Sequence, residues 1–263
     1  MKLSVVVPSL TGERPQGLAE DPRVEIVVVK GVSPVGRARD EGLWRATGDY
    51  VAWVDADDEV TENWLDEIWQ TLSSRPDVVV LGHEWVQPDG FSFTRVWRGT
   101  DLLGDVLAQR GIRSELWNFV VRRALWKGIR FDPAARVLED WAVVPRLLMR
   151  AHSVVSVGKA VYRYRVNASS LTQRRGDADL QRETFARMVA REGQIRSLGL
   201  WRRYGRETLI GIANAICLSP GAGAWMRRKL LGVLVSPAPM RQKVKWVLFA
   251  LGLGRLVKRR YGK

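Results

Sequence analysis

The chain has 263 residues, of which 46% are apolar, and a formal charge of +14. This composition excludes a disordered chain and allows one α/β domain of ordinary size with a helical appendage. A single cysteine, Cys217, excludes an internal disulfide, and no run reaches the roughly 20 apolar residues that span a bilayer. The apolar run within residues 1–8 is too short for a signal peptide, so we expect a cytoplasmic protein.

The first third of the chain alternates between predicted strands and helices. Continuous β-branched runs are typical of strands buried on both faces of a parallel sheet. These runs occupy residues 3–7, 24–29, 50–54 and 78–81. Apolar residues at helical spacing predict helices over 39–46 and 62–72. The segment 10–23 is short and contains two prolines, which predicts that the helix between the first two strands is reduced.

The remainder of the chain continues this alternation and then becomes helical. A two-fold pattern with a Pro-Asp-Gly turn predicts a hairpin over 85–97. Further helices are expected over 101–110 and 141–151, short strands over 154–157 and 161–164, and mostly helix after residue 177. The predicted fold is therefore a wound α/β domain with a mostly parallel central sheet over 1–176, followed by a helical extension over 177–263.

Three carboxylates follow the predicted strand at 50–54, namely Asp55, Asp57 and Asp58. Ligands of open α/β sheets bind beyond the carboxyl ends of the strands, and acids crowded there repel one another unless a cation lies among them. Mg²⁺ and Mn²⁺ take such oxygen ligands together with substrate phosphates. The alternative is that Asp57 or Asp58 caps a helix that begins near Thr61.

A block of residues before this cluster gives it a context. Residues 36–43 read G-R-A-R-D-E-G-L, then come Ala46, Gly48 and Asp49, and the chain opens with S-V-V-V-P at 4–8. The ordered set resembles inverting glycosyltransferase family 2, which has the GT-A fold and reads A-R-N-x-G, x-A-x-G-x-Y and an apolar strand ending in D-x-D-D. The similarity covers about residues 3–172, with Asp40 in place of the usual asparagine.

A second motif, Leu138-Glu139-Asp140-Trp141, resembles the later part of the same family. The resemblance implies that Asp140 is the general base, which removes the proton of the acceptor hydroxyl, and that Glu139 orients the acceptor or adjusts the base. It also implies that an S-x-T segment within 169–172 closes over the diphosphate. The alternative for both acids is stabilisation of a helix N-terminus by negative charge.

The resemblance implies a nucleotide-sugar donor, most simply a UDP-sugar, and a glycan or lipid-linked glycan acceptor in polysaccharide biosynthesis. The expected donor-binding residues are Pro8, Ser9, Arg39, Asp55, Ala56, Asp57, Ser170 and Arg174. The expected ligands of Mn²⁺ or Mg²⁺ are Asp57, Asp55 and Asp58. Arg174 has the alternative of being a solvated basic residue.

Two features set limits on this assignment. The second strand of the family normally ends in acids that contact the nucleoside, whereas residues 28–33 read V-V-K-G-V-S. The base is then read by backbone groups, or the donor does not carry uracil. Trp117 and Trp141 are the candidate sugar-stacking residues nearest the second motif, although aromatic residues at helical spacing usually pack in a core.

The last part of the chain has an unusual charge distribution. Residues 208–263 contain eleven Lys or Arg and no Asp or Glu. Segments 225–231 and 243–249 mix apolar and basic residues as interfacial helices do, which predicts a peripheral position on the inner face of an anionic membrane. The alternative is a helical cap that packs on itself with its cations in water. A catalytically inert nucleotide-binding scaffold remains the second function, and nothing predicts nucleic-acid binding.

Overall fold

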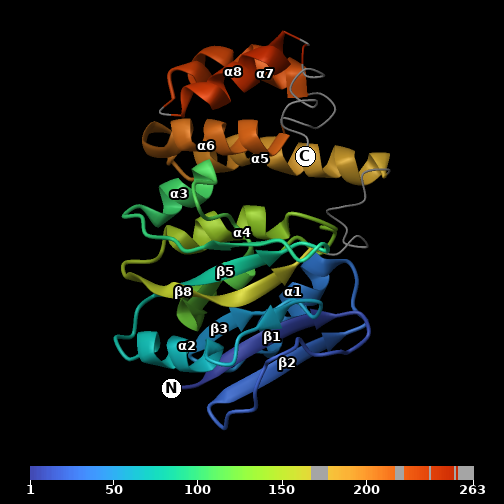
Figure 1. The fold of residues 1–263 in the computed structure, drawn as a ribbon, viewed down its shortest axis with the longest axis vertical. Coiled ribbons are helices and arrows are strands. Elements are labelled where there is room, and N and C mark those ends of the chain that lie inside the picture. The colour runs from blue at the N-terminus through green and yellow to red at the C-terminus, as the bar shows by residue number, and fades with distance from the viewer. Residues whose placement is uncertain (167–176, 217–221, 237, 252, 254–263) are drawn as a thin grey trace. The chain divides into compact units, whose positions relative to one another are not determined.

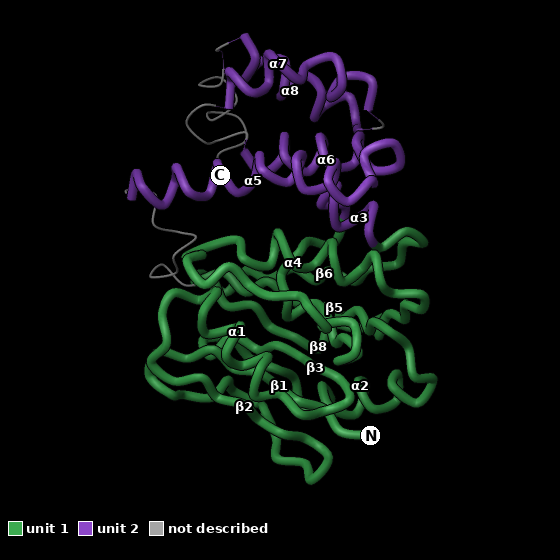
Figure 2. The backbone as a smooth tube through the Cα atoms, turned by 180° about the vertical axis from the view of Figure 1, so that it is seen from behind, with its two compact units in different colours: residues 1–102, 111–174 green, residues 103–110, 175–263 purple. Residues whose placement is uncertain are grey.

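The computed structural model describes residues 1–166, 177–216, 222–236, 238–251 and 253. They form two compact units (Figure 2). Unit 1 contains Met1–Leu102 and Gly111–Arg174, and unit 2 contains Leu103–Arg110 and Arg175–Lys263. The sequence analysis placed one boundary at residue 176 and did not anticipate that Leu103–Arg110 belongs with the C-terminal helices. Within the described ranges, no helix is both long enough and apolar enough to cross a bilayer.

Unit 1 is built on one mixed sheet (Figure 1). Its strands are β1 (Leu3–Ser9), β2 (Val24–Lys30), β3 (Tyr50–Trp53), β4 (Glu59–Val60), β5 (Val78–Val86), β6 (Ser92–Arg95), β7 (Phe119–Arg122) and β8 (Val154–Arg165). The order is β2-β1-β3-β7-β5-β8-β4, with β6 paired to β5. Strands β2, β1 and β3 are parallel, as are β5 and β8, and β7 joins the two groups by antiparallel pairing on both sides. The predicted α/β class is confirmed.

Helices cover both faces of this sheet. The helices of unit 1 are α1 (Val35–Arg45), α2 (Trp64–Leu72) and α4 (Glu139–Leu148), with the 3₁₀ turns η1 (Leu116–Asn118) and η2 (Arg123–Trp126). Helix α2 packs in a core with Val5 and Val7, whereas α1 approaches Val6. Because successive side chains of a strand point to opposite faces, α1 and α2 lie on opposite sides of β1.

Two glycines of the G-R-A-R-D-E-G block permit close approach. A Cβ on Gly42 would lie 2.2 Å from Val6 Cγ1, and one on Gly36 would lie 2.1 Å from the Asp132 carbonyl oxygen. Only glycine lets α1 pack at this distance from β1 and from the segment before α4. The block thus positions α1, and with it Arg39.

The structure differs from the sequence predictions at several elements. The two strands expected over 154–164 are one continuous strand, β8, which contains Gly158 at φ +78°. Strands β4 and β7 were not predicted; β4 has two residues, too few to show a pattern. No helix occurs between β1 and β2, in agreement with the expected reduction, and the hairpin is formed by β5 and β6.

Unit 2 is helical. Its helices are α5 (Ala178–Ser197), α6 (Trp201–Ile216), α7 (Ala222–Leu234) and α8 (Met240–Ala250), and α3 (Leu102–Ala108) has all but its first residue in this unit. Trp225 and Trp246, expected on interfacial helices, are buried in the core of this unit. The helices nevertheless leave large apolar side chains exposed, namely Leu231, Val235, Met240, Val244, Leu251 and Leu253. The basic segment 258–260 lies outside the described residues.

Candidate active site

The carboxyl ends of β1 and β3 lie side by side, because the two strands are parallel and paired. Val54 N donates to the Val6 carbonyl at 3.1 Å, which carries the pairing to the last residue before Asp55. Pro8 and Ser9 therefore lie at the same sheet edge as Asp55. Ser9 is buried, and its hydroxyl accepts a hydrogen bond from Gly12 N at 2.9 Å, which fixes the turn after β1.

Arg39 connects the two acidic motifs. Its Nη2 donates to Asp55 Oδ1 at 3.0 Å, and its Nη1 forms an ion pair with Glu139. The side chains of Arg39 and Glu139 are 8% and 4% exposed, so this pair is removed from water. One guanidinium therefore holds the end of β3 against the start of α4, which brings residues about 85 positions apart in the sequence into one site.

Glu139 is buried, and its carboxylate faces Arg39. This contact positions the start of α4. That Glu139 orients the acceptor or adjusts the base stays a prediction. The neighbouring Asp140 is the second residue of α4 and is half-buried.

The backbone immediately before this pair adopts an uncommon conformation. Leu138, the N-terminal cap of α4, has φ +57° and ψ +29°, in the left-handed region. Residues other than glycine are uncommon in this region. Those that adopt it concentrate at functional sites, where the surrounding structure holds the strained backbone in place. Both Glu139 and Asp140 lie in the first turn of α4, as the alternative explanation required, so helix-end stabilisation and catalysis are compatible here.

Asp57 and Asp58 lie in contrasting environments. Asp57 is exposed, yet partial desolvation of its carboxylate and the nearby charge of Asp55 raise its pKa. Asp58 is buried, and burial together with the charge of Asp55 raises its pKa to about 8. Neither acid caps α2, which begins at Trp64 after an Asn63 cap.

Asp58, one of the three predicted metal ligands, has both carboxylate oxygens in hydrogen bonds. Its Oδ2 lies 2.6 Å from the Tyr162 hydroxyl and its Oδ1 accepts from Arg165 N at 2.9 Å. Among the described residues, no three His, Cys, Asp or Glu side chains come together as ligands of one ion. Asp57 is the exposed member of the three, and the metal-ligand roles stay predictions.

Tyr162 is a residue of this site that the sequence analysis did not assign. Its buried hydroxyl is hydrogen-bonded to Asp58 and accepts from Asp55 N at 3.2 Å, so it supports the turn that carries both acids. The signal was present in the Y-R-Y-R pattern at 162–165, because alternation along a strand places the two tyrosines on one face and the two arginines on the other. Arg163 and Arg165 both pair with Glu59.

The remaining predicted residues divide into two groups. Trp117 and Trp141 are buried, so neither is an exposed platform for a sugar, and Ala56 is half-buried beside the acids. Ser170 and Arg174 lie outside the described residues.

Comparison with known proteins bears on the family and on the fold. Residues 13–138 match the sequence model described as Glycosyl transferase family 2, which ends just before Glu139. The chain is 23% identical over 192 residues to Glycosyltransferase GlyG of Streptococcus pneumoniae serotype 4, covering 66% of this chain and 63% of that protein. It is 24% identical over 155 residues to the Putative glycosyltransferase EpsH of Bacillus subtilis, covering 53% and 44%.

The fold is also similar to that of solved structures. The TarS 1-349 structure of S. aureus superposes with a TM-score of 0.62 at 13% identity, covering all of this chain and 92% of that one. Its complex with UDP-GlcNAc gives a TM-score of 0.60 at 15% identity, with coverage of 100% and 93%. The chain spans less than two thirds of the curated relatives' own lengths. The motif order and the matching family model over residues 13–138 support a glycosyltransferase of family 2, and the similarly folded structures support the GT-A fold.

Proposed function

We propose that the protein transfers a sugar, with inversion, from a nucleotide-diphosphate sugar to a hydroxyl of a glycan or lipid-linked glycan. The observation that carries this proposal is the Arg39 bridge, because it places the candidate base motif beside the acidic end of β3. A uridine donor is supported by the similarly folded TarS, whose structure is a complex with UDP-GlcNAc. The end of β2 carries Lys30 and no acid, so with a uridine donor the base would be read by backbone groups.

The proposed transfer assigns a step to each residue of the site. Asp140 accepts the proton of the acceptor hydroxyl as that oxygen forms a bond to the anomeric carbon. The bond from the anomeric carbon to the phosphate oxygen breaks on the opposite side, and the nucleoside diphosphate leaves with the electron pair. Arg39 and Glu139 position Asp55 and Asp140 relative to one another, and Pro8 and Ser9 shape the donor side of the sheet edge.

The carboxylates at the end of β3 offer few ligands to a divalent cation. Desolvation and then the charge of Asp55 raise the pKa of Asp57, and a cation beside the carboxylate would favour its charged form. Asp57 would hold Mn²⁺ or Mg²⁺, with Asp55 as a neighbour and the donor diphosphate supplying further oxygens. The ion would supply positive charge to the departing diphosphate.

Calorimetry and a turnover assay test this proposal. We expect the wild-type protein to bind UDP-GlcNAc or another nucleotide-sugar more tightly with Mn²⁺, and Asp57→Asn to lose that dependence while remaining folded. Asp140→Asn should retain donor binding but release nucleoside diphosphate about 10²–10⁴-fold more slowly. Asp66→Asn, an exposed acid on α2, is the matched control and should behave as wild type. Binding without turnover would favour the inert scaffold, and no nucleotide-sugar binding would refute the proposal.

We also propose a peripheral membrane position through α7 and α8. Leu231 and Met240 are 76% and 72% exposed, and Val244 is 51% exposed. Positions 240 and 244 share one face of α8, and the tail carries cations without acids, so apolar burial and attraction to anionic lipid act together. This surface would bring the enzyme to a lipid-linked acceptor on the inner face of the membrane.

Liposome flotation of full-length variants tests the membrane proposal. Truncation before α7 would open the core that contains Trp225 and Trp246, so surface substitution is the sharper change. Leu231→Ser with Val244→Ser should reduce recovery with anionic vesicles, whereas Phe91→Ser, an exposed aromatic of the β5–β6 turn, should not. Equal recovery of all three proteins, or recovery independent of anionic lipid, would show that α7 and α8 only pack on each other.

A further inference from the structure

Strand β8 lies against the acidic turn, the segment 55–58 that joins β3 to β4 and carries the three acids. Strand β4, which follows the turn, pairs antiparallel with β8, and Val60 lies opposite Tyr162 in this register. Arg163 and Arg165 of β8 both form ion pairs with Glu59 of β4. The acidic turn is therefore fixed by β3 at one end and by β8 at the other, and all of these residues belong to unit 1.

The hydroxyl of Tyr162 makes two hydrogen bonds to the acidic turn. It accepts from Asp55 N at 3.2 Å and donates to Asp58 Oδ2 at 2.6 Å. Asp58 N in turn donates to the Asp55 carbonyl at 3.1 Å, so one hydroxyl contacts both ends of a hydrogen-bonded turn. Asp57, the exposed acid, lies in the backbone between these two bonded residues, and its position follows theirs.

Asp55 is held at two different places by two different elements. Arg39 of α1 donates to its side-chain Oδ1 at 3.0 Å, whereas Tyr162 of β8 accepts from its backbone N. The first contact limits rotation of the carboxylate, and the second limits displacement of the main chain that carries it. The Arg39 contact cannot replace the Tyr162 contact, because a side chain that is held at its tip still follows its backbone.

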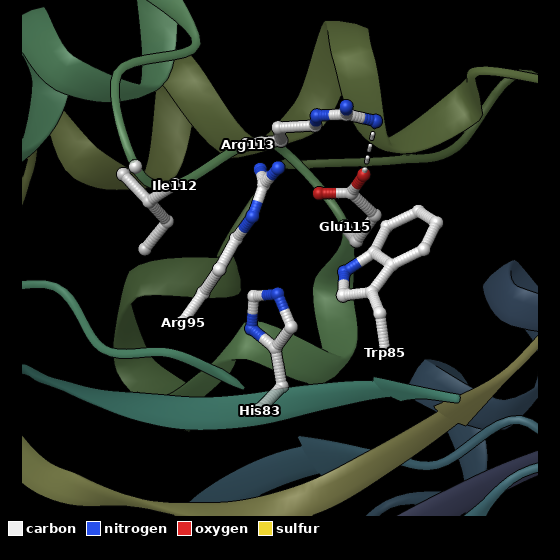
Figure 3. A pocket seen from close by; sticks show the side chains of 7 residues that line it. His83, Trp85, Arg95, Ile112, Arg113 and Glu115 are labelled. Carbon is white, nitrogen blue, oxygen red and sulfur yellow. Dashed lines mark ion pairs between the residues drawn. The ribbon is translucent and has the colours of Figure 1, made fainter. Parts of the chain in front are cut away.

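The ring of Tyr162 is itself fixed by its neighbours. It is fully buried, and Trp117 stacks on it with centroids 4.8 Å apart and planes 4° apart. His83 of β5 meets Trp117 edge to face at 4.7 Å, and the His83 ring lies between Arg95 and Trp85 (Figure 3). Close packing of this kind leaves the Tyr162 hydroxyl a single position, so it can serve as a fixed point for the acidic turn.

We propose that Tyr162 is a positioning residue for donor binding: its hydroxyl holds the backbone of Asp55 and Asp58 and thereby sets where the carboxylate of Asp57 meets the cation and the donor diphosphate. The inference rests on the proposed function, since it names a residue on which that site depends. Tyr162 acts through the acids, because its hydroxyl is buried and is engaged by Asp55 and Asp58. Binding groups must be held within about 0.5 Å of their productive geometry, so loss of this contact should weaken Mn²⁺-dependent donor binding about tenfold.

Two tyrosine-to-phenylalanine variants of the full-length protein separate positioning from stability. Tyr162→Phe removes the hydroxyl and keeps the ring on Trp117. Tyr50→Phe is the matched control, because the Tyr50 hydroxyl is also buried, donates to the Pro76 carbonyl at 2.7 Å, and belongs to the first residue of β3, at the opposite end of the strand from the acids. Both substitutions should lower the urea midpoint, since each removes buried hydrogen bonding. In calorimetry with UDP-GlcNAc and Mn²⁺, we expect Tyr162→Phe to bind about tenfold more weakly and Tyr50→Phe to bind as wild type does.

The backbone amide of Asp55 gives a readout that does not need the donor. In protein labelled with ¹⁵N-aspartate, its NMR signal is assigned by its loss in Asp55→Asn. We expect this signal to shift and the amide to exchange faster with water in Tyr162→Phe, which lacks the acceptor, and to stay unchanged in Tyr50→Phe. If Tyr162→Phe does not fold, the same comparison is made in the Asp58→Asn background, which removes the buried carboxylate that loses its donor and can still accept from Arg165 N.

The two readouts distinguish failure of this inference from failure of the proposed function. Equal donor affinity of the Tyr162 and Tyr50 variants, or an Asp55 signal that Tyr162→Phe leaves unchanged, would overturn the positioning role. Absent donor binding in the wild type would instead refute the proposed function, and the Asp55 signal would still decide whether Tyr162 holds the acidic turn.

Discussion

Replacement of Arg39 by methionine should destabilise unit 1 strongly. The side chain is 8% exposed, and its partner Glu139 is 4% exposed, so the substitution leaves a buried carboxylate without its counter-ion. Removal of one partner of a buried pair typically costs about 3–5 kcal/mol, a large part of the 5–15 kcal/mol that stabilises a domain. We expect a lower urea midpoint with an unchanged m-value, followed by circular dichroism.

The double variant Arg39→Met with Glu139→Met separates charge burial from packing. It removes both charges and should recover most of the lost stability, because an apolar pair of similar volume is often as stable as a buried ion pair. Donor affinity should stay low in both variants, since Asp55 loses the guanidinium that holds it in either case.

The surface pair of Arg130 and Asp40 provides the control for this experiment. The two side chains are 3.3 Å apart and 64% and 27% exposed, so Arg130→Met should cost at most about 1 kcal/mol. An Arg39→Met loss no larger than that of Arg130→Met would refute the view that Arg39 is a buried link between the two motifs.

Two further predictions concern pH and packing. His83 is buried, and its pKa falls from 6.5 to about 4 on folding, so it contributes stability that is present above pH 6.5 and is lost as pH falls toward 4. His83→Phe should remove this dependence, which amounts to at most about 3.4 kcal/mol, and urea unfolding at pH 4 and pH 7 measures it. Gly42→Ala should lower the free energy of unfolding by about 1–3 kcal/mol, because the new Cβ would lie 2.2 Å from the rigid Val6 side chain. Gly193→Ala, which has open space around it in α5, should raise the free energy of unfolding by about 0.5–1 kcal/mol. Equal effects of the two substitutions in thermal or urea unfolding would contradict the assigned contact.

Much of unit 1 could be predicted from local sequence. The strands β1, β2, β3 and the first half of β5 are continuous β-branched runs, and the two-residue and 3.6-residue periods separate strand from helix without knowledge of contacts. Strand β4 was missed because two residues are too few to establish a period, and β7 was missed although it is as long as β3; both pair with strands that are distant in the chain. Asp55 and Asp57 could be proposed as site residues from sequence because they directly follow a strand, and ligands bind at the carboxyl ends of strands.

The tertiary structure decided the roles of individual acids. Three adjacent carboxylates look alike in the sequence, yet Asp58 turns inward to Tyr162 and Arg165 while Asp57 remains exposed. The same holds for Glu139, which looks like an acceptor-orienting residue in the motif but is buried against Arg39. The direction and burial of these side chains depend on partners about 100 residues away in the chain, such as Tyr162 for Asp58. A local sequence pattern therefore cannot predict them.

The sequence by itself therefore indicated the family resemblance, the α/β class and the sheet edge of the candidate site, because these depend on residue order and on short-range periodicity. Only the tertiary structure decided which carboxylates are buried and that Arg39 joins the two motifs. The physical reason is that charge pairing and desolvation depend on distances between side chains, and the fold sets those distances by bringing together segments that are far apart in the chain.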